Sequence, residues 1–311
     1  MPVPRGILPS LVVIVALLLS ACGAPIPDGT PGPPVVLAAP VALAAGTSGV
    51  SEIGGRPVEV HVPPAYGPAD PVPLLVVLHG LGSDPARVDA LLGLRHEASE
   101  RGVLYVLPEG TRGSDGRRFW NATDACCDRD ATGVDDSAYL ATVVRELAVT
   151  YAVDPGRVAV VGYSNGGFMA HRTACDHADL VSVAVSLAGA TAADDDACRP
   201  SAPVSVVQVH GTEDPVIAVG GGRRDGRAYP SAEETALAWA RLDDCADGPA
   251  VTTAGRDLDM SVPGPETTVA AWSGCADGAR VELWTIAGGD HAPELGPAFA
   301  PAVLDLVTGV D

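Results

Sequence analysis

The stretch VAVVGYSNGG, residues 158–167, decides the fold of this 311-residue chain. Its β-branched beginning predicts a buried strand, and the residues after Gly167 are suited to start a helix. Ser164 then occupies the turn between strand and helix, flanked by Gly162 and Gly166 in the pattern G-x-S-x-G. A β carbon at either glycine would collide with neighbouring backbone in so sharp a turn. The stretch therefore predicts a strained turn that lifts a serine hydroxyl clear of a sheet.

An acid and a histidine follow Ser164 in the order that a reactive serine needs. A serine hydroxyl is a weak nucleophile, so it requires a base, and a carboxylate must orient that base. Two later predicted strands end just before Asp214 and just before His291, while Glu213 is the rival acid. The order serine, acid, histidine is typical of this kind of turn. We predict that Ser164 is a nucleophile with these partners, and not a bystander in a glycine-rich loop.

Two backbone N–H groups are candidates to bind the oxyanion that forms when a serine attacks a carbonyl carbon. Such donors must point at the position where the negative oxygen develops. One is the N–H of Asn165, directly after the serine. The other is the N–H of Leu81, in the glycine-containing loop after an apolar strand. His79 precedes that loop, and we interpret it as a residue that shapes the loop.

Apolar runs alternate with helix signals over the rest of the chain. They predict strands at 58–62, 74–78, 103–107, 182–187, 204–210 and 281–286. Capping residues and apolar spacing predict helices at about 84–101, 135–151, 231–242 and 297–307. This alternation predicts an α/β fold with a mostly parallel central sheet and helices on both faces.

The first 22 residues indicate a targeting segment. Arg5 precedes an apolar stretch that is short for a transmembrane span. The segment ends in Leu-Ser-Ala-Cys-Gly, which resembles a bacterial lipobox and marks Cys22 for lipidation; ordinary secretion with cleavage nearby is the alternative. We expect an exported chain, periplasmic, at the cell surface or secreted, with a flexible tether over residues 23–50 and one catalytic domain over residues 51–311.

Seven cysteines support export, because lipidation of one of them leaves six for three disulfides in an oxidising compartment. Cys245 and Cys275 lie in the same late region and form the first predicted pair. The other two disulfides are then expected to join Cys126 and Cys127 to Cys175 and Cys198. No C-x-x-C spacing is present and the histidines are not grouped near the cysteines, so we expect no metal site.

The net charge of −20 limits the partners of the chain. Nucleic-acid binding needs a basic surface, and docking on anionic lipid also needs positive charge. We therefore expect no nucleic-acid partner and no membrane contact beyond an N-terminal lipid anchor. No glycine motif with a suitably placed lysine is present to bind a phosphate, so we expect no cofactor. We also expect the chain to be monomeric.

Several stretches resemble the polyhydroxybutyrate depolymerase and feruloyl esterase family of the α/β-hydrolases. They are Trp-Asn-Ala at 120–122 with Cys-Cys at 126–127 and Val-Asp-Asp at 134–136, Gly-Tyr-Ser-Asn-Gly-Gly at 162–167, and His-Gly-Thr-Glu-Asp at 210–214. The likeness covers roughly residues 51–292, and some family members are exported lipoproteins. It implies an α/β-hydrolase fold and the same three catalytic residues.

The resemblance also implies ester substrates, either hydroxybutyrate-type oligomers or feruloyl-type esters. Related sequences commonly carry tryptophan and proline after the catalytic histidine, whereas Ala292 and Pro293 follow His291 here. One aromatic wall of the substrate pocket is therefore expected to be missing, and Trp120 is the candidate to line the pocket, with a packed loop anchor as the alternative. The alternatives to a serine esterase are a serine peptidase and a non-catalytic, lipid-anchored binding protein on the same fold.

Overall fold

The computed structural model describes residues 1–2 and 42–309. The helices are α1 (Pro85–Leu92), α2 (Leu94–Glu100), α3 (Asp136–Thr150), α4 (Asn165–Asp176), α5 (Ala232–Leu242) and α6 (Phe299–Thr308), with short 3-10 turns at Asp195–Ala197 and Ala276–Gly278. The strands of the main sheet are β1 (Ser48–Ile53), β2 (Arg56–His61), β3 (Val72–Leu78), β4 (Leu104–Pro108), β7 (Val153–Tyr163), β8 (Val183–Leu187), β9 (Ser205–Gly211), β12 (Asp247–Arg256), β13 (Thr267–Ser273) and β14 (Val281–Ile286).

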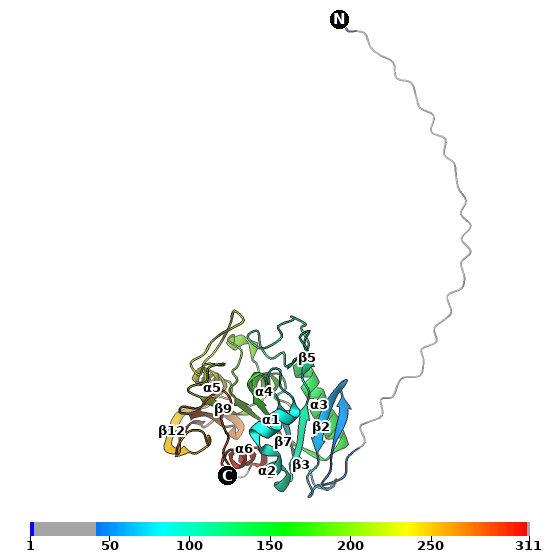
Figure 1. The fold of residues 1–311 in the computed structure, drawn as a ribbon, viewed down its shortest axis with the longest axis vertical. Coiled ribbons are helices and arrows are strands. Elements are labelled where there is room, and N and C mark those ends of the chain that lie inside the picture. Colours follow the sequence, from blue (N-terminus) through cyan, green and yellow to red (C-terminus); the bar gives the residue numbers. More distant parts are fainter. Residues whose placement is uncertain (3–41, 310–311) are drawn as a thin grey trace, which may run out of the picture. The chain divides into compact units, whose positions relative to one another are not determined.

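The main sheet has a parallel centre and antiparallel ends. Its strand order is β1-β2-β4-β3-β7-β8-β9-β14-β13-β12, and Figure 1 shows β2 and β12 at opposite sides of the sheet. Neighbouring strands from β4 to β14 run parallel, whereas β1, β2, β12 and β13 join antiparallel. Two short hairpins lie outside it, β5 (Thr111–Arg112) with β6 (Arg118–Phe119) and β10 (Gly222–Arg224) with β11 (Arg227–Tyr229). The carboxyl ends of the parallel strands therefore meet at one edge, where loops carry functional groups.

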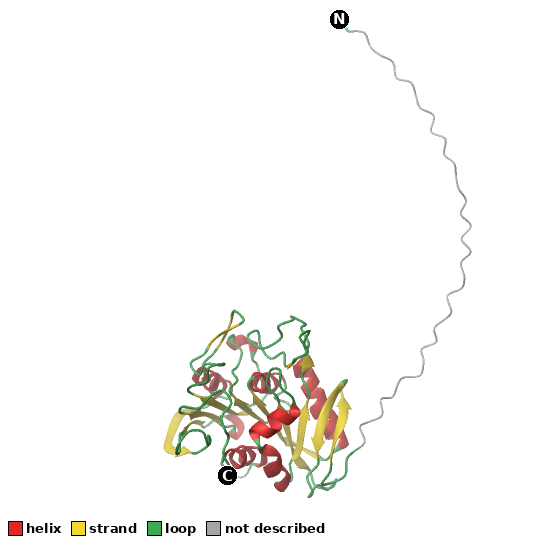
Figure 2. Ribbon diagram, viewed as in Figure 1, coloured by secondary structure: helices red, strands yellow, loops and turns green. Residues whose placement is uncertain are grey.

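Helices cover both faces of the sheet, because the central strands are apolar on both sides (Figure 2). Along β3, Leu74 and Val76 belong to the core beneath α3, α4 and α5. Leu75 and Val77 point the other way and belong to the core beneath α1, α2 and α6. Alternate residues of a strand face opposite sides of a sheet, so one apolar run serves two cores. The predicted α/β fold with helices on both faces is confirmed.

Several predicted boundaries differ from the structure. The helix predicted over 84–101 is two helices, because Gly93 takes a left-handed backbone conformation with φ of 62° that ends α1. Strands β1, β12 and β13 were absent from the prediction. Strand β1 begins at Ser48, and the backbone N–H of Leu43 donates to the Tyr151 hydroxyl at 3.0 Å. The folded domain therefore starts before the predicted boundary at residue 51.

The targeting segment from residue 3 onward, including Cys22, and the tether as far as residue 41 lie outside the described residues. Among the residues that the structure does describe, no helix is long and apolar enough to cross a membrane.

Candidate active site

Ser164 lies at the predicted sharp turn between β7 and α4. Its backbone φ of 53° is in the left-handed region, which a serine adopts only when the surroundings enforce it. A β carbon at Gly162 would overlap the backbone of Gly166, and a β carbon at Gly166 would overlap the carbonyl oxygen of Leu78. The turn is held from below by the Ser164 N–H, which donates to the carbonyl oxygen of Leu187 at 2.8 Å. Both glycines are thus required by close backbone approach.

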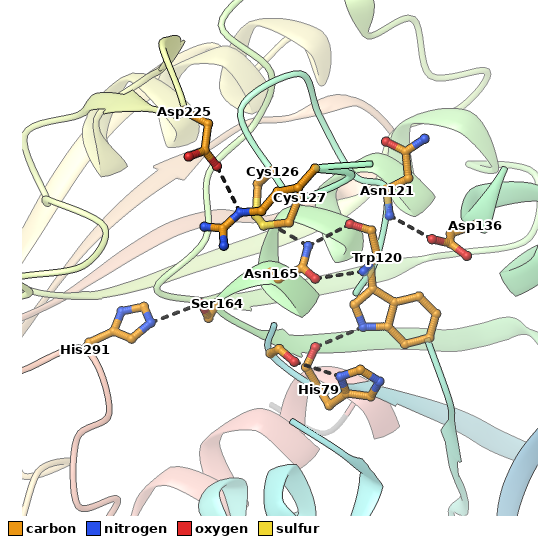
Figure 3. The surroundings of a disulfide bond; sticks show 12 residues. His79, Trp120, Asn121, Cys126, Cys127, Asp136, Ser164, Asn165, Asp225 and His291 are labelled. Atoms are coloured by element: carbon orange, nitrogen blue, oxygen red, sulfur yellow. Dashed lines mark hydrogen bonds and ion pairs between the residues drawn. A yellow bond between two sulfur atoms is a disulfide. The ribbon is translucent and has the colours of Figure 1, made fainter. Parts of the chain in front are cut away.

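The structure brings the three predicted residues together in one hydrogen-bonded array. The Ser164 Oγ lies 3.0 Å from His291 Nε2 (Figure 3), and His291 Nδ1 lies 2.7 Å from Asp214 Oδ2. Asp214 follows β9 and His291 follows β14. The ends of these parallel strands therefore place both residues beside the sharp turn at residues 162–166, which we call the elbow. The rival Glu213 is exposed to solvent. Because His291 bonds to a carboxylate through Nδ1, its Nε2 is left to face the serine hydroxyl.

The Asp214 carboxyl is arranged to remain ionised. Its burial raises the pKa, but hydrogen bonds from His210, His291 and two backbone N–H groups outweigh the burial and hold the pKa of Asp214 well below its ordinary value. The two backbone donors are those of Val216 at 2.8 Å and Ile217 at 2.9 Å, both to Oδ1. A permanently charged carboxylate stabilises positive charge on His291 when that imidazole accepts a proton.

The ring of Tyr163 packs beside the array, with its centroid 5.2 Å from that of His291. Burial raises the pKa of Tyr163 to about 12, so its hydroxyl stays neutral. It contributes a wall next to the imidazole and no additional negative charge.

Both loops predicted to supply oxyanion donors lie beside Ser164. Asn165 is the first residue of α4, where backbone N–H groups point out of the helix end. Leu81 is in the loop after β3, and a β carbon at the preceding Gly80 would lie 3.5 Å from the Ser164 β carbon. The loop therefore passes close to the hydroxyl. The roles of Leu81 and Asn165 in binding an oxyanion stay predictions.

Trp120 does not line a pocket, and the prediction that it does is wrong. Its side chain is fully buried, and its indole Nε1 donates to the carbonyl oxygen of His79 at 2.9 Å. Its backbone N–H donates to Asn165 Oδ1, and its carbonyl oxygen accepts from Asn165 Nδ2, both at 2.8 Å (Figure 3). The tryptophan is a loop anchor because each of its polar groups is used in joining the 120–127 segment to the elbow and to the loop after β3.

His79 is also a structural residue, as predicted. Its Nδ1 lies 2.8 Å from the carbonyl oxygen of Gly80, and the N–H of Gly110 donates to its Nε2 at 3.0 Å. Burial lowers the pKa of His79, which favours the neutral ring that can accept the bond from Gly110. It fixes the loop that carries Leu81.

Asp136, the first residue of α3, supports the site although no role in the site was predicted for it. Its buried carboxylate accepts from Arg56 Nη1 at 2.6 Å, from Thr111 Oγ1 at 2.9 Å and from the N–H of Asn121 at 2.7 Å. It thereby fixes the chain directly after Trp120. The signal in the sequence is a second aspartate where a helix cap needs only one.

Comparison with known proteins is consistent with this geometry. The profile of the phospholipase/carboxylesterase family matches residues 67–233. The chain belongs to this family. It is 30% identical over 288 residues to the putative esterase NocK of Nocardia uniformis, a match that covers 85% of this chain and 79% of that protein.

Other matches to this carboxylesterase-family chain span smaller parts of their relatives. It is 26% identical over 245 residues to feruloyl esterase B of Piromyces equi, covering 76% of this chain and 42% of the relative. It is 29% identical over 170 residues to poly(3-hydroxyalkanoate) depolymerase C of Paucimonas lemoignei, covering 50% of this chain and 39% of the relative. The chain thus spans less than half the length of these two proteins.

Among solved structures, an acetyl xylan esterase from Aspergillus awamori aligns with a TM-score of 0.61 and 14% identity. The alignment covers 85% of this chain and 99% of that one. This likeness shows the fold, and with the family match it confirms the predicted α/β-hydrolase architecture.

The disulfides of this family member differ in part from the prediction. Cys245 pairs with Cys275 as predicted. The expected cross-pairing of the remaining four is wrong, because Cys126 and Cys127 bond to each other and Cys175 bonds to Cys198. Cys175 lies in the last turn of α4, and the chain after β8 returns to place Cys198 with the two Cα atoms 5.6 Å apart. The adjacent pair instead lies against the elbow, with Cys126 Sγ 3.4 Å from Asn165 Nδ2 (Figure 3).

A cavity of about 900 Å³ runs along α4 beyond the elbow. Its walls come from α4, from the loop after Trp120, from the segment after β8 and from the β10–β11 hairpin. Two exposed ion pairs join the loop to the hairpin, Arg129 with Asp225 at 3.1 Å and Arg227 with Asp124 at 3.8 Å. The residues that line the cavity include many charged and hydrogen-bonding groups, among them Asp124, Arg172 and Arg227. Among the described residues, no group of three histidine, cysteine or acidic side chains is placed to hold a metal ion.

Proposed function

We propose that this chain is an exported serine esterase that hydrolyses carboxylic esters through Ser164, His291 and Asp214. Membership of the phospholipase/carboxylesterase family supports the coarser statement, a carboxylic-ester hydrolase. The observation that carries the finer one is the continuous array from Asp214 through His291 to Ser164, located at a strained elbow.

In the proposed reaction, Ser164 Oγ attacks the ester carbonyl carbon while His291 Nε2 accepts its proton. The carbonyl oxygen becomes negative and is held by the N–H groups of Leu81 and Asn165. His291 then gives the proton to the departing alcohol, which leaves an acyl group on Ser164. Water attacks this acyl-enzyme with His291 again accepting a proton, and the free acid departs. Asp214 keeps the imidazole oriented and stabilises its charged form.

We propose feruloyl-type esters or hydroxybutyrate-type oligomers as substrates. The matches to a feruloyl esterase and to a polyhydroxyalkanoate depolymerase support this choice. Trp120 is buried and therefore cannot replace the aromatic wall that related sequences carry after the catalytic histidine. This favours the aliphatic oligomers over the aromatic acids.

The test is hydrolysis of p-nitrophenyl acetate, p-nitrophenyl butyrate, methyl ferulate and 3-hydroxybutyrate oligomers by the full chain. Ser164→Ala should reduce turnover of every ester to the background rate with the fold intact, and Ser201→Ala, at an exposed serine in a loop, is the matched control. Activity retained in Ser164→Ala would overturn the nucleophile assignment. Cleavage of amides alone would identify a peptidase, and no labelling by a fluorophosphonate probe would identify a binding protein.

We also propose that the chain is exported and carries a lipid at Cys22. The three disulfides support export, because such bonds persist in oxidising compartments. Metabolic labelling with a fatty acid should mark the wild-type chain and not Cys22→Ala. Labelling of neither chain, with both of them in the medium, would indicate ordinary secretion.

A further inference from the structure

A chain of buried polar side chains leads away from Asp214 into the core beneath α4 and α5. His210 and Gln208 are on β9, His171 is on α4 and Trp239 is on α5. Their exposed fractions are 1%, 0%, 2% and 0%. The contacts are His210 Nδ1 to Gln208 Nε2 at 3.1 Å, Gln208 Oε1 to His171 Nε2 at 2.8 Å, and His171 Nδ1 to Trp239 Nε1 at 3.0 Å. Burial of polar groups costs free energy that apolar groups in the same space would not cost, so these polar side chains need an explanation.

Trp239, the side chain furthest from Asp214 in this hydrogen-bonded series, fixes the direction of every hydrogen bond in the series. The indole of Trp239 can only donate, so His171 Nδ1 accepts and carries no hydrogen. Burial lowers the pKa of His171 to about 4, which agrees with a neutral ring that has its single hydrogen on Nε2. That hydrogen is donated to Gln208 Oε1. The amide orientation of Gln208 is thereby set.

The carbonyl oxygen of Gly189 fixes the same orientation of the Gln208 amide, independently of Trp239. The Nε2 of Gln208 also donates to the carbonyl oxygen of Gly189 at 2.9 Å, and a carbonyl oxygen can only accept. The other hydrogen on that nitrogen is donated to His210 Nδ1. His210 is therefore neutral, with its one hydrogen on Nε2.

The hydrogen on His210 Nε2 is directed at the turn that presents the acid. The Nε2 atom lies 2.8 Å from the carbonyl oxygen of Ile217 and 3.3 Å from Asp214 Oδ2. The same turn supplies the backbone N–H groups of Val216 and Ile217 that bind Asp214 Oδ1. Were the hydrogen on Nδ1 instead, the Nε2 lone pair would face a carbonyl oxygen and a carboxylate, and the turn would be repelled.

We propose that His210 is a positioning residue of the reaction: through its Nε2–H it holds the turn from Asp214 to Ile217, and Trp239, His171 and Gln208 act together to place that hydrogen. This inference rests on the proposed function only in treating Asp214 as the residue that orients His291. The ring of His210 contacts Gln208, Ile217 and Asp214 and has no hydrogen bond to Ser164 or His291, so it acts through Asp214.

The test compares two substitutions that differ in one hydrogen-bond donor. His210→Phe keeps a flat ring and has no donor, whereas His210→Gln can place an amide N–H near the position of the Nε2–H. A lost hydrogen bond to a charged group predicts that kcat falls roughly 10- to 100-fold in His210→Phe, and KM stays within about twofold. His210→Gln should recover most of the loss, and His96→Gln, at an exposed histidine on α2, should match the wild type.

Titration with a fluorophosphonate separates positioning from folding. The final number of labelled sites per chain should be equal in all variants, with slower labelling in His210→Phe. A wild-type kcat in His210→Phe, or equal losses in the Phe and Gln variants with fewer sites labelled, would overturn the proposal. An inactive wild-type chain would instead refute the proposed esterase function.

A measurement on the unaltered chain tests the inference even if the variants fail to fold. The ¹⁵N resonances of histidine show which ring nitrogen carries hydrogen, and through-bond correlation of each ring with its own backbone assigns the His210 and His171 signals in the unaltered chain. We expect hydrogen on Nε2 of both His210 and His171, and none on their Nδ1 atoms. Hydrogen on Nδ1 of His210 would refute the proposed direction of the chain.

Discussion

Replacing Asp243 by asparagine should reveal a pH dependence of stability that the wild-type protein conceals. Asp243 follows α5 and is fully buried, where Oδ1 accepts from the N–H of Val204 at 3.2 Å. Burial raises the pKa of Asp243 from its ordinary 3.8 to about 6. His171 behaves in the opposite way, because burial lowers its pKa from 6.5 to about 4.

The two groups give slopes of opposite sign. Between pH 3.8 and about 6 the folded state binds more protons than the unfolded state at Asp243, so the free energy of unfolding falls as pH rises. Between about 4 and 6.5 the unfolded state binds more protons at His171, so the free energy of unfolding rises with pH. Each change amounts to about 2 kcal/mol over the window from about pH 4.5 to 6.5, and the two nearly cancel. The depressed pKa of Asp214 acts only at lower pH.

In Asp243→Asn the slope from His171 is no longer opposed by Asp243. The free energy of unfolding should drop by about 2 kcal/mol from about pH 6.5 to 4.5, whereas the wild-type value should change little. Urea unfolding followed by circular dichroism with the disulfides intact measures both profiles. Asp257→Asn, the same change at an exposed aspartate that is not a cause of the raised pKa of Asp243, is the control and should follow the wild type. Parallel profiles for Asp243→Asn and wild type would refute the opposing assignments.

Three further outcomes are expected. Replacing Cys245 and Cys275 by serine opens a loop closed over a sequence separation of 30 and should lower the free energy of unfolding by about 3–4 kcal/mol in urea titrations, and an unchanged midpoint would contradict the loop-entropy account. Gly166→Ala should give little folded protein by circular dichroism, because its β carbon overlaps strand backbone, whereas Gly156→Ala meets only a side-chain atom at 3.5 Å and should fold normally. Asn165→Ala removes two buried hydrogen bonds to the backbone of Trp120 and should lower stability by about 2–4 kcal/mol together with kcat, so a variant with wild-type melting temperature and activity would show that these bonds are dispensable.

The elbow and its partners could be predicted because each depends on local chemistry. Gly162 and Gly166 are required by backbone contacts within the turn itself, and the apolar run before Ser164 is long enough to identify a buried strand. Asp214 and His291 follow strands of the same kind, so their meeting needs only a parallel sheet. This much follows from the order of residues.

The parts that the sequence did not reveal depend on contacts between distant segments. Trp120 is buried because Asn165, 45 positions later, satisfies its backbone groups, and no local pattern announces that partner. The pairing of Cys126 with Cys127 was missed because six cysteines permit 15 connectivities and spacing does not choose among them. The contacts of His210 with Gln208 and Ile217 could not be predicted, because neither partner gives a signal in composition. Strand β13 was missed because its alternation of buried and exposed residues is imperfect.

The ion pairs between the loop after Trp120 and the β10–β11 hairpin have a consequence for the cavity beside α4. Arg129 with Asp225 and Arg227 with Asp124 are all largely exposed, and exposed pairs contribute only about 0–1 kcal/mol each. Ions shield such pairs strongly once the Debye length shrinks to about 10 Å or less. Dissolved salt therefore weakens the two contacts that join these walls of the cavity. The part-buried array of Asp214, His291 and Ser164 is screened much less, so a change of ionic strength acts on the rim of the cavity more than on the reacting groups.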